Sequence, residues 1–172
     1  MPRQFEQLLI FFERGGPVLV AVLAVSTLLW ILILERYWFL NVKYPKKLET
    51  IIQRWEKRHD RSSWYALRLR EGLLAEISLT IQAYLYPIQT ITQVLPLLGL
   101  LGTVTGMIAI FDVITVFGTG NARGMADGIS RALLPTTAGL TTAIVGLYFC
   151  ANLKHRAKIE QQKAQDRLNI SE

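Results

Sequence analysis

The sequence predicts an all-α integral membrane protein with three transmembrane helices, long helices that project into the cytoplasm, and assembly into an oligomeric bundle. Three observations carry this prediction. The 172 residues are 51% hydrophobic and 19% charged, whereas ordinary soluble domains carry about 25% charged residues. Residues 18–34 and 132–153 contain no charged side chain, and residues 88–130 contain only three. The pattern excludes a disordered chain, a coiled coil and most soluble enzymes.

Residues 2–14 are predicted to form an interfacial helix on the outer leaflet of the membrane. Their apolar side chains share one helical face: Phe5, Leu8, Leu9 and Phe12. Such a face suits a helix that lies in the plane of the membrane surface. The glycine pair at 15–16 then ends the segment.

The first transmembrane helix is predicted at residues 17–40. Its centre is an uncharged, mainly apolar run of 17 residues from Val18 to Leu34, which is at the short end of the range for a spanning helix. Pro17 suits the start, because the N–H that proline lacks would have no partner there. A cleaved signal peptide is the alternative. The apolar run is longer than the apolar region of a signal peptide and begins further from the N-terminus, and no A-x-A cleavage site follows it.

Residues 41–87 have helical rather than strand periodicity and are predicted to be cytoplasmic. The apolar stripes are Leu48, Ile51, Ile52 and Trp55, and then Leu67, Leu74, Ile77 and Ile81. Residues 60–63 can break the chain and cap a new helix. No strong breaker precedes Pro87, so we expect one helix from Ser63 to Phe117, about 80 Å long and kinked at Pro87 and Pro96.

The second and third transmembrane helices are predicted at residues 88–117 and 128–153. The short segment between them, 118–127, is rich in turn residues, so the two spans form an antiparallel hairpin. The tail at 154–172 continues the third helix into the cytoplasm. Helices that extend beyond the bilayer with apolar stripes need neighbours, which predicts an oligomer.

Basic residues set the predicted orientation. Residues 35–87 carry ten Lys and Arg and the tail carries five, against three in the N-terminal segment and the short loop. The positive-inside rule therefore places the N-terminus in the periplasm and the C-terminus in the cytoplasm. An anionic lipid leaflet accounts for the positive charge, so no nucleic acid partner is predicted.

Small residues form a packing face on each span of the hairpin. They are Gly99, Gly102 and Gly106 in the second span and Gly139, Ala143 and Gly146 in the third. Lipid supplies no hydrophobic drive between helices, so small residues favour association by letting the backbones approach closely. We expect tight packing within a bundle.

Threonines are the most informative polar residues of the hairpin: Thr103, Thr105, Thr136, Thr137, Thr141 and Thr142. Each hydroxyl alone could bond back to its own helix. Six in two linked spans could instead line a wet path where several subunits meet. Pro135 removes a backbone donor at this depth and frees a carbonyl, which a threonine or a water can satisfy.

Two charged residues, Asp112 and Arg131, lie inside the apolar zone near the outer ends of their spans. An ionised side chain at mid-bilayer costs about 2.5–3.5 kcal/mol, and less near the interface. We expect the two to lie at similar depth and to pair, within or between subunits. Separate snorkelling of each side chain to the interface is the alternative.

No catalytic or metal-binding arrangement is recognised. One cysteine, Cys150, and two distant histidines, His59 and His155, do not support a CxxC or zinc site. The glycines at 118–124 miss the GxGxxG spacing and follow no strand, and Ser130 has no intramembrane histidine partner. The sequence therefore predicts neither an enzyme nor a cofactor nor a metal site.

Three stretches resemble one known family. LPLLGLLGTVTGMI at residues 95–108 is similar to the second transmembrane segment of ExbB and TolQ, which belong with MotA to a family of proton-driven stators and channels. DGISRALLPTTAGLTTAIVG at residues 127–146 is similar to their third segment, and GGPVL followed by Glu35 and Arg36 to their first. The compact chain looks most like an ExbB of an auxiliary TonB system.

The resemblance implies that residues 1–172 form a single proton-channel domain in the bacterial inner membrane. It implies a homopentamer around a pair of ExbD-like transmembrane helices. Such an assembly would couple the proton-motive force, through a TonB-like protein, to outer-membrane uptake of, for example, iron–siderophores or haem. Thr103 and Thr136 match polar threonines of the family and are expected, with Thr137, to face the pore.

Position 131 departs from the family pattern. The third segment usually has glutamate where this chain has Arg131, and a permanently protonated guanidinium cannot relay protons as a carboxylate does. Three interpretations stay open. The chain is a stator subunit whose partner supplies the titrating group, a non-conducting membrane scaffold that stabilises partner subunits, or a TolQ-like subunit of the Tol-Pal envelope system.

Overall fold

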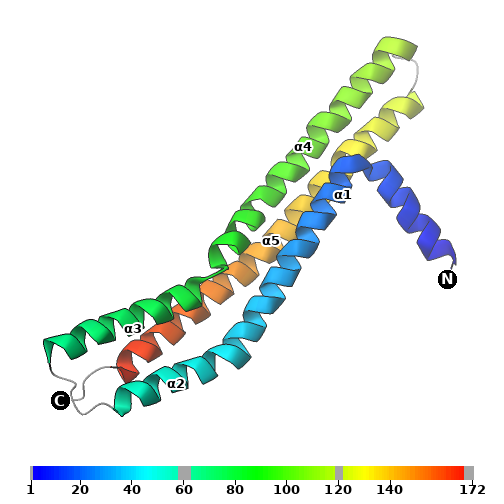
Figure 1. The fold of residues 1–172 in the computed structure, drawn as a ribbon. Helices are drawn as coiled ribbons and strands as arrows, with labels where there is room; N and C mark the ends of the chain where they lie inside the picture. The colour runs from blue at the N-terminus through cyan, green and yellow to red at the C-terminus, as the bar shows by residue number, and fades with distance from the viewer. Residues whose placement is uncertain (1, 58–62, 119–121, 169–172) are drawn as a thin grey trace. The chain divides into compact units, whose positions relative to one another are not determined.

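The computed structural model describes residues 2–57, 63–118 and 122–168. Nearly all of these residues are helical and none forms a strand, which confirms the predicted all-α fold class (Figure 1). The elements in chain order are α1 (Pro2–Trp38), the π-helical stretch η1 (Phe39–Lys43), α2 (Tyr44–Glu56), α3 (Trp64–Gln82), α4 (Leu85–Phe117) and α5 (Ala122–Arg167). The predicted break at 60–62, the loop residues 119–121 and positions 169–172 of the tail lie outside the described residues.

Three helical stretches are long and apolar enough to cross a membrane. They are Gly15–Trp55, Trp64–Val116 and Arg123–Arg167. Each contains the centre of one predicted span, so the prediction of three membrane-spanning helices is confirmed. The chain is a multi-pass membrane protein.

The chain forms two compact units. The first contains Met1–Trp30 and Gln89–Leu147, and the second contains Ile31–Ile88 and Tyr148–Glu172. The second carries fifteen of the nineteen Lys and Arg residues. We call the first the apolar unit and the second the basic unit.

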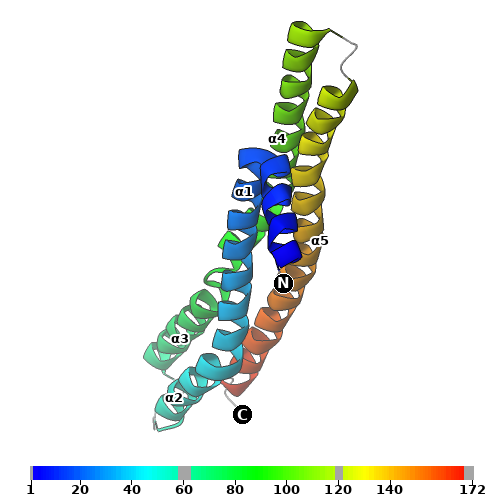
Figure 2. The ribbon, with the colours of Figure 1, turned by 90° about the vertical axis from the view of Figure 1, so that its right-hand side faces the viewer.

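In the apolar unit, α4 and α5 lie side by side and run antiparallel (Figures 1 and 2). Leu95 and Gly106 of α4 contact Gly139 and Ala132 of α5 respectively, so the order of contacts along one helix is reversed along the other. α1 packs against this pair, with Val18 near Gly102. The predicted antiparallel hairpin of the second and third spans is therefore present.

A sharp turn divides α1 within the apolar unit. Gly16 has φ 65° and ψ −172°, outside the helical region, and a positive φ of this kind favours glycine. Pro17 follows, and proline disfavours helical geometry in the residue before it. The segment before Gly16 turns away from the rest of α1 (Figure 1), and its backbone is helical from Pro2. The side chains of residues 2–14, on which the predicted interfacial face depends, lie outside the description.

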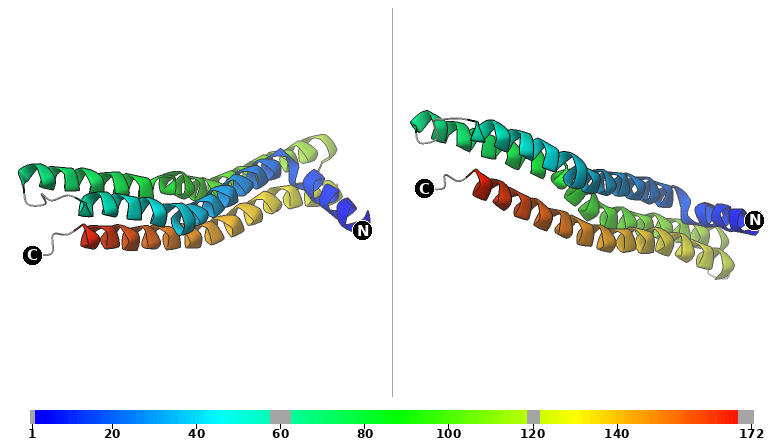
Figure 3. Two further views of the ribbon diagram at one scale, coloured as in Figure 1. Left: turned by 60° about the horizontal axis from the view of Figure 1, so that its bottom comes forward. Right: turned by 90° about the horizontal axis from the view of Figure 1, so that it is seen from below.

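The basic unit packs three helical segments side by side: the end of α1 with η1 and α2, then α3, and the C-terminal part of α5 (Figure 3). Its buried apolar side chains include Leu48, Ile52, Trp55, Ile77, Ile81, Leu153 and Ala157. Most of the two predicted apolar stripes is therefore buried. Leu67 is an exception at 40% exposed, because the adjacent Ala66 takes the buried position.

The single helix predicted from Ser63 to Phe117 is wrong, because the chain breaks between α3 and α4. Ala83 has ψ 141° and Tyr84 has φ 64°. The physical reason is Pro87: in a continuous helix its ring would clash with the carbonyl of the residue four positions earlier, which is Ala83. After the break, Pro87 lies in the first turn of α4, where its missing N–H removes no helical bond. Pro96 remains inside α4.

A π-helical stretch, η1, joins α1 to α2. The backbone N–H of Tyr44 donates to the carbonyl of Phe39, five residues earlier. Pro45 follows directly, and in an ordinary helix its ring would clash with the Asn41 carbonyl. The wider turn relieves that clash without ending the helix.

Candidate functional site

The seam between α4 and α5 contains four of the small residues predicted to pack: Gly99, Gly102, Gly106 and Gly139. A Cβ atom added to Gly106 would lie 2.5 Å from the Cβ of Ala132, and one added to Gly102 would lie 2.6 Å from the Cβ of Pro135. Carbon atoms that are not bonded do not approach so closely. The two backbones are therefore adjacent only because these positions lack side chains.

The remaining small residues lie further along α5. Ala143 is buried. A Cβ atom added to Gly146 would lie 2.9 Å from Leu29 Cδ2 of α1 and 3.3 Å from the Thr92 hydroxyl oxygen of α4. Gly146 is therefore where all three helices of the apolar unit converge.

Thr136 forms a hydrogen bond across the seam. Its hydroxyl donates to the carbonyl oxygen of Gly99 at 2.7 Å and also lies 3.3 Å from the carbonyl oxygen of Ala132 in its own helix. The bond across the seam is possible because Gly99 brings its backbone next to α5: a Cβ atom added there would lie 3.0 Å from the Cα of Thr136. The seam therefore positions a half-buried hydroxyl between two membrane-spanning helices.

Thr103 lies on the same side of the seam as Thr136. It follows Gly99 by four residues, and such residues lie one above the other on a helix. Gly102 and Pro135, by contrast, meet beside Val18 of α1. The two threonine hydroxyls thus lie on the side of the hairpin away from α1, and Thr103 donates to the Leu100 carbonyl at 2.6 Å.

Thr137 does not join the other two threonines. It is exposed and lies about 100° further round α5 than Thr136. Its hydroxyl donates to the carbonyls of Leu133 and Leu134 at 3.2 and 3.0 Å. Of the three threonines predicted to share a path, Thr103 and Thr136 lie on the same side of the seam, and Thr137 bonds back to its own helix on another face.

The pairing expected between Asp112 and Arg131 is wrong within one chain. Arg131 Nε instead lies 3.2 Å from Asp127 Oδ2, one turn earlier in α5. The register of the hairpin explains the difference: Gly106 faces Ala132 and Ile110 faces Gly128. Arg131 is therefore level with the residue after Gly106, about 7–8 Å along the helix axis from Asp112. A contact between subunits stays a prediction.

Arg131 also lies on a different face of α5 from Thr136. Five residues separate the two positions, which is about 140° round the helix. The side chains of Arg131 and Asp127 are each half exposed. An aspartate four residues before an arginine is a favourable pair on a helix surface, and this pair holds the guanidinium away from the threonines.

Sequence reasoning missed Arg36, which is only 2% exposed in the basic unit. Its Nη2 donates to the carbonyl oxygen of Thr80 at 2.8 Å and to that of Ile81, and the guanidinium lies 4.7 Å from the centre of the Phe39 ring. These carbonyls belong to the last turn of α3 and have no partner within that helix. The signal in the sequence was a single arginine between an apolar run and aromatic residues.

Two tyrosines connect the segments of the basic unit. The Tyr37 hydroxyl donates to Asn152 Oδ1 at 2.8 Å, and the Tyr44 hydroxyl donates to the Glu160 carbonyl at 3.4 Å.

The described residues contain no group of three or more His, Cys, Asp or Glu that could hold a metal ion. His59 lies outside the described residues. Cys150 is buried.

A family comparison matches residues 44–166 to the MotA/TolQ/ExbB proton channel family. The chain belongs to this family. The match covers α2, α3 and the whole hairpin with its glycine seam, Thr103, Thr136 and Arg131. It confirms the resemblance to ExbB, TolQ and MotA that the sequence motifs indicated.

Curated proteins that are similar to this chain carry ExbB-like names. Biopolymer transport protein ExbB-like 3 of Synechocystis sp. is 38% identical over 109 residues, 59% of this chain and 51% of that protein. ExbB-like 1 of the same organism is 46% identical over 63 residues, which cover 35% of this chain and 25% of that protein. ExbB-like 1 of Helicobacter pylori is 23% identical over 170 residues, which cover 88% of this chain and 89% of that protein. The chain thus spans about half the length of the first relative. No solved structure matches it.

Proposed function

We propose that this chain is an ExbB-like stator subunit of the bacterial inner membrane, with its N-terminus in the periplasm and its C-terminus in the cytoplasm. With an ExbD-like partner it couples the proton-motive force, through a TonB-like protein, to outer-membrane uptake. Iron–siderophores and haem are the substrate classes we propose for that uptake. The chain itself has no enzymatic activity in this proposal.

The observation that carries the proposal is the position of Thr103 and Thr136. Both belong to the hairpin that matches the family, and both lie on the side of the seam away from α1. A homopentamer that turns this side inward would surround its axis with threonine hydroxyls. Hydroxyls can both donate and accept hydrogen bonds, which suits a hydrated proton path.

Because α4 and α5 are in direct contact along the seam, we place the path between copies of the chain. A pair of ExbD-like transmembrane helices would occupy the axis and supply the titrating carboxylate. Arg131 cannot take that part, because its guanidinium stays protonated and is paired with Asp127. The partner would then carry the only group that changes charge during proton transfer.

The Arg131–Asp127 pair also favours a second candidate, a non-conducting scaffold that stabilises partner subunits. Here the arginine would serve only to anchor the outer end of α5. A TolQ-like role in the Tol-Pal envelope system shares the stator mechanism and differs in its partner. Co-purification with a TonB-like or a Tol-type partner protein separates the two stator roles.

The test compares Thr136→Val with Thr137→Val, two changes of identical size. The full chain is co-purified with its ExbD-like partner and placed in lipid vesicles, and proton flux is followed with a pH-sensitive dye. We expect Thr136→Val to reduce flux about tenfold, equivalent to about 1.4 kcal/mol in the barrier. Thr137→Val, on the other face, should conduct normally. Unchanged flux in Thr136→Val, or an equal loss in both, would contradict the path. No flux in the unmodified complex would favour the scaffold.

A further inference from the structure

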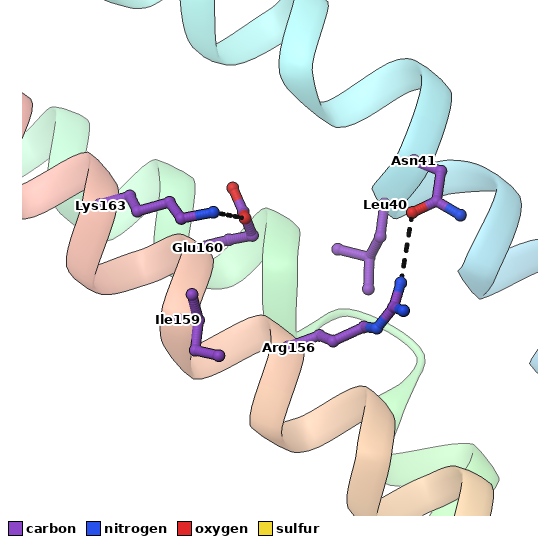
Figure 4. Close-up of a pocket in the computed structure, with 6 residues that line it drawn as sticks. All are labelled: Leu40, Asn41, Arg156, Ile159, Glu160 and Lys163. Carbon is purple, nitrogen blue, oxygen red and sulfur yellow. Dashed lines mark hydrogen bonds and ion pairs between the residues drawn. The ribbon is translucent and has the colours of Figure 1, made fainter.

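A cavity of about 220 Å³ lies in the basic unit between η1 and α5 (Figure 4). Its lining consists of Leu40, Asn41, Arg156, Ile159, Glu160 and Lys163. We propose that this cavity binds the phosphate of an anionic phospholipid headgroup, in the leaflet on the basic side of the membrane. The proposal concerns lipid binding and does not depend on proton conduction.

The donors in the cavity suit a phosphate. Arg156 Nη1 donates to Asn41 Oδ1 at 3.4 Å, and its guanidinium lies 5.4 Å from the centre of the Tyr37 ring. These contacts hold the guanidinium beside Asn41 of η1 (Figure 4) and use one of its five N–H groups. Arginine binds phosphate through paired N–H groups, and the amide of Asn41 supplies a further donor beside it.

One carboxylate in the cavity lining, that of Glu160, would repel a bound anion. Glu160 Oε1 accepts a bond from Lys163 Nζ at 2.7 Å (Figure 4). The lysine therefore neutralises the glutamate, and the net charge of the lining is that of Arg156. This arrangement makes a specific prediction: removing the glutamate charge should release the lysine and strengthen anion binding.

The depth of the cavity matches the headgroup layer. Asn41 follows the last residue of the first apolar run, Leu34, by seven residues, and Arg156 follows the last residue of the third run, Leu153, by three. These separations are about 10 Å and about 5 Å along a helix. The headgroup layer is roughly 5–8 Å thick on each side of the hydrocarbon. Arg156 thus lies within the headgroup layer, and Asn41, which accepts a hydrogen bond from it, lies at or just beyond the outer edge of that layer.

The size and the apolar lining also suit a headgroup. Pockets for whole drug-sized ligands measure about 300–1,000 Å³, so a cavity of about 220 Å³ suits a phosphate with its immediate substituents. Leu40 and Ile159 line the same cavity and can contact the glycerol end of the acyl chains. An amphiphile fits this combination better than a free anion.

Native mass spectrometry of the detergent-purified full chain provides the test. Dioleoyl phosphatidylglycerol and dioleoyl phosphatidylcholine are titrated separately, and lipid adducts are counted. We expect the unmodified protein to prefer phosphatidylglycerol, and Arg156→Gln to weaken that binding about tenfold, the effect of losing about 1.4 kcal/mol. Lys158→Gln is the control, because it removes one exposed positive charge of α5 outside the cavity. Equal losses in both variants would overturn the site.

Two further arms keep the result decisive. Glu160→Gln should bind phosphatidylglycerol more tightly than the unmodified protein, so this arm does not depend on a loss that misfolding could mimic. Unchanged or weaker binding in Glu160→Gln would contradict the proposal. Inorganic phosphate is titrated as competitor: failure to displace the lipid supports a headgroup site, and displacement at similar concentration would identify a soluble anion instead.

Discussion

At the scale of single residues, Gly106 sets the separation of α4 and α5. A Cβ atom added there would lie 2.5 Å from the Ala132 Cβ and 2.7 Å from its backbone nitrogen. A backbone nitrogen cannot move aside as the end of a flexible side chain can. Gly72 in α3 provides the contrast, because an added Cβ would meet nothing within 4 Å.

Gly106→Ala should therefore destabilise the protein, and Gly72→Ala should not. Overpacking of this kind costs about 1–3 kcal/mol, whereas replacing an exposed helical glycine by alanine gains about 0.5–1 kcal/mol. The midpoint of thermal unfolding in detergent, followed by tryptophan fluorescence, measures both. A Gly106→Ala protein as stable as the original would show that the seam has room to open.

The residue types of the seam could be predicted from the sequence, but the partners of its charged residues could not. Spacing alone places Gly99, Gly102 and Gly106 on one helical face. The depth of Asp112 relative to Arg131 depends on the register between two helices, which follows from Gly106 meeting Ala132. The prediction counted from the ends of the spans and so placed the two charges level with each other.

At the scale of elements, the end of α3 depends on a side chain from another helix. Arg36 donates to the carbonyls of Thr80 and Ile81, and a cation at the C-terminus of a helix also complements the helix dipole. The next residues, Ala83 and Tyr84, leave helical geometry. Arg36 thus satisfies the carbonyls that this break would otherwise leave buried without partners.

Arg36→Met should loosen the last turn of α3. Loss of a buried donor leaves unsatisfied carbonyls at a cost of about 1–3 kcal/mol, so amide hydrogen exchange near residues 80–86 should accelerate. Arg68→Met is the matched control. Its side chain is 65% exposed and paired with Glu71 on the surface, and such pairs contribute about 0–1 kcal/mol. Equal exchange rates in the two variants would show that Arg36 does not hold the end of α3.

The break itself was predictable only in part. Pro87 was recognised as a disturbance, but the disturbance appears four residues earlier, at the carbonyl that its ring would strike. The same reasoning applies to Pro45 and η1, where the chain widens a turn rather than breaking. In both cases the sequence contains the cause, a proline ring, but does not reveal whether the backbone breaks or widens a turn.

At the scale of the whole molecule, the hairpin presents large apolar side chains to its surroundings. On α4, Leu97, Leu100, Val104, Ile108 and Phe111 are each at least half exposed. On α5, Leu133, Ile144 and Leu147 are similarly exposed. Lipid or further protein must cover these surfaces, and the proposed pentamer with an ExbD-like pair assigns part of them to protein.

The native mass of the detergent-purified chain, alone and co-expressed with an ExbD-like partner, tests that assignment. We expect a pentamer that retains a pair of partner chains. Because the seam fixes the hairpin within each copy, Gly106→Ala should reduce assembly, whereas Gly72→Ala should leave it intact. A monomer, or an oligomer that binds no such partner, would favour the scaffold candidate and remove the threonine-lined axis.

The glycine seam has a mechanical consequence. Sliding α5 past α4 by one turn would bring Ala132 against Ile110 in one direction and Thr136 against Leu95 in the other, because glycines occupy only the turns between those two large side chains. Either displacement would replace a contact at a glycine by a contact with a larger side chain, which favours the present register. We therefore expect α4 and α5 to move together rather than to slide along each other.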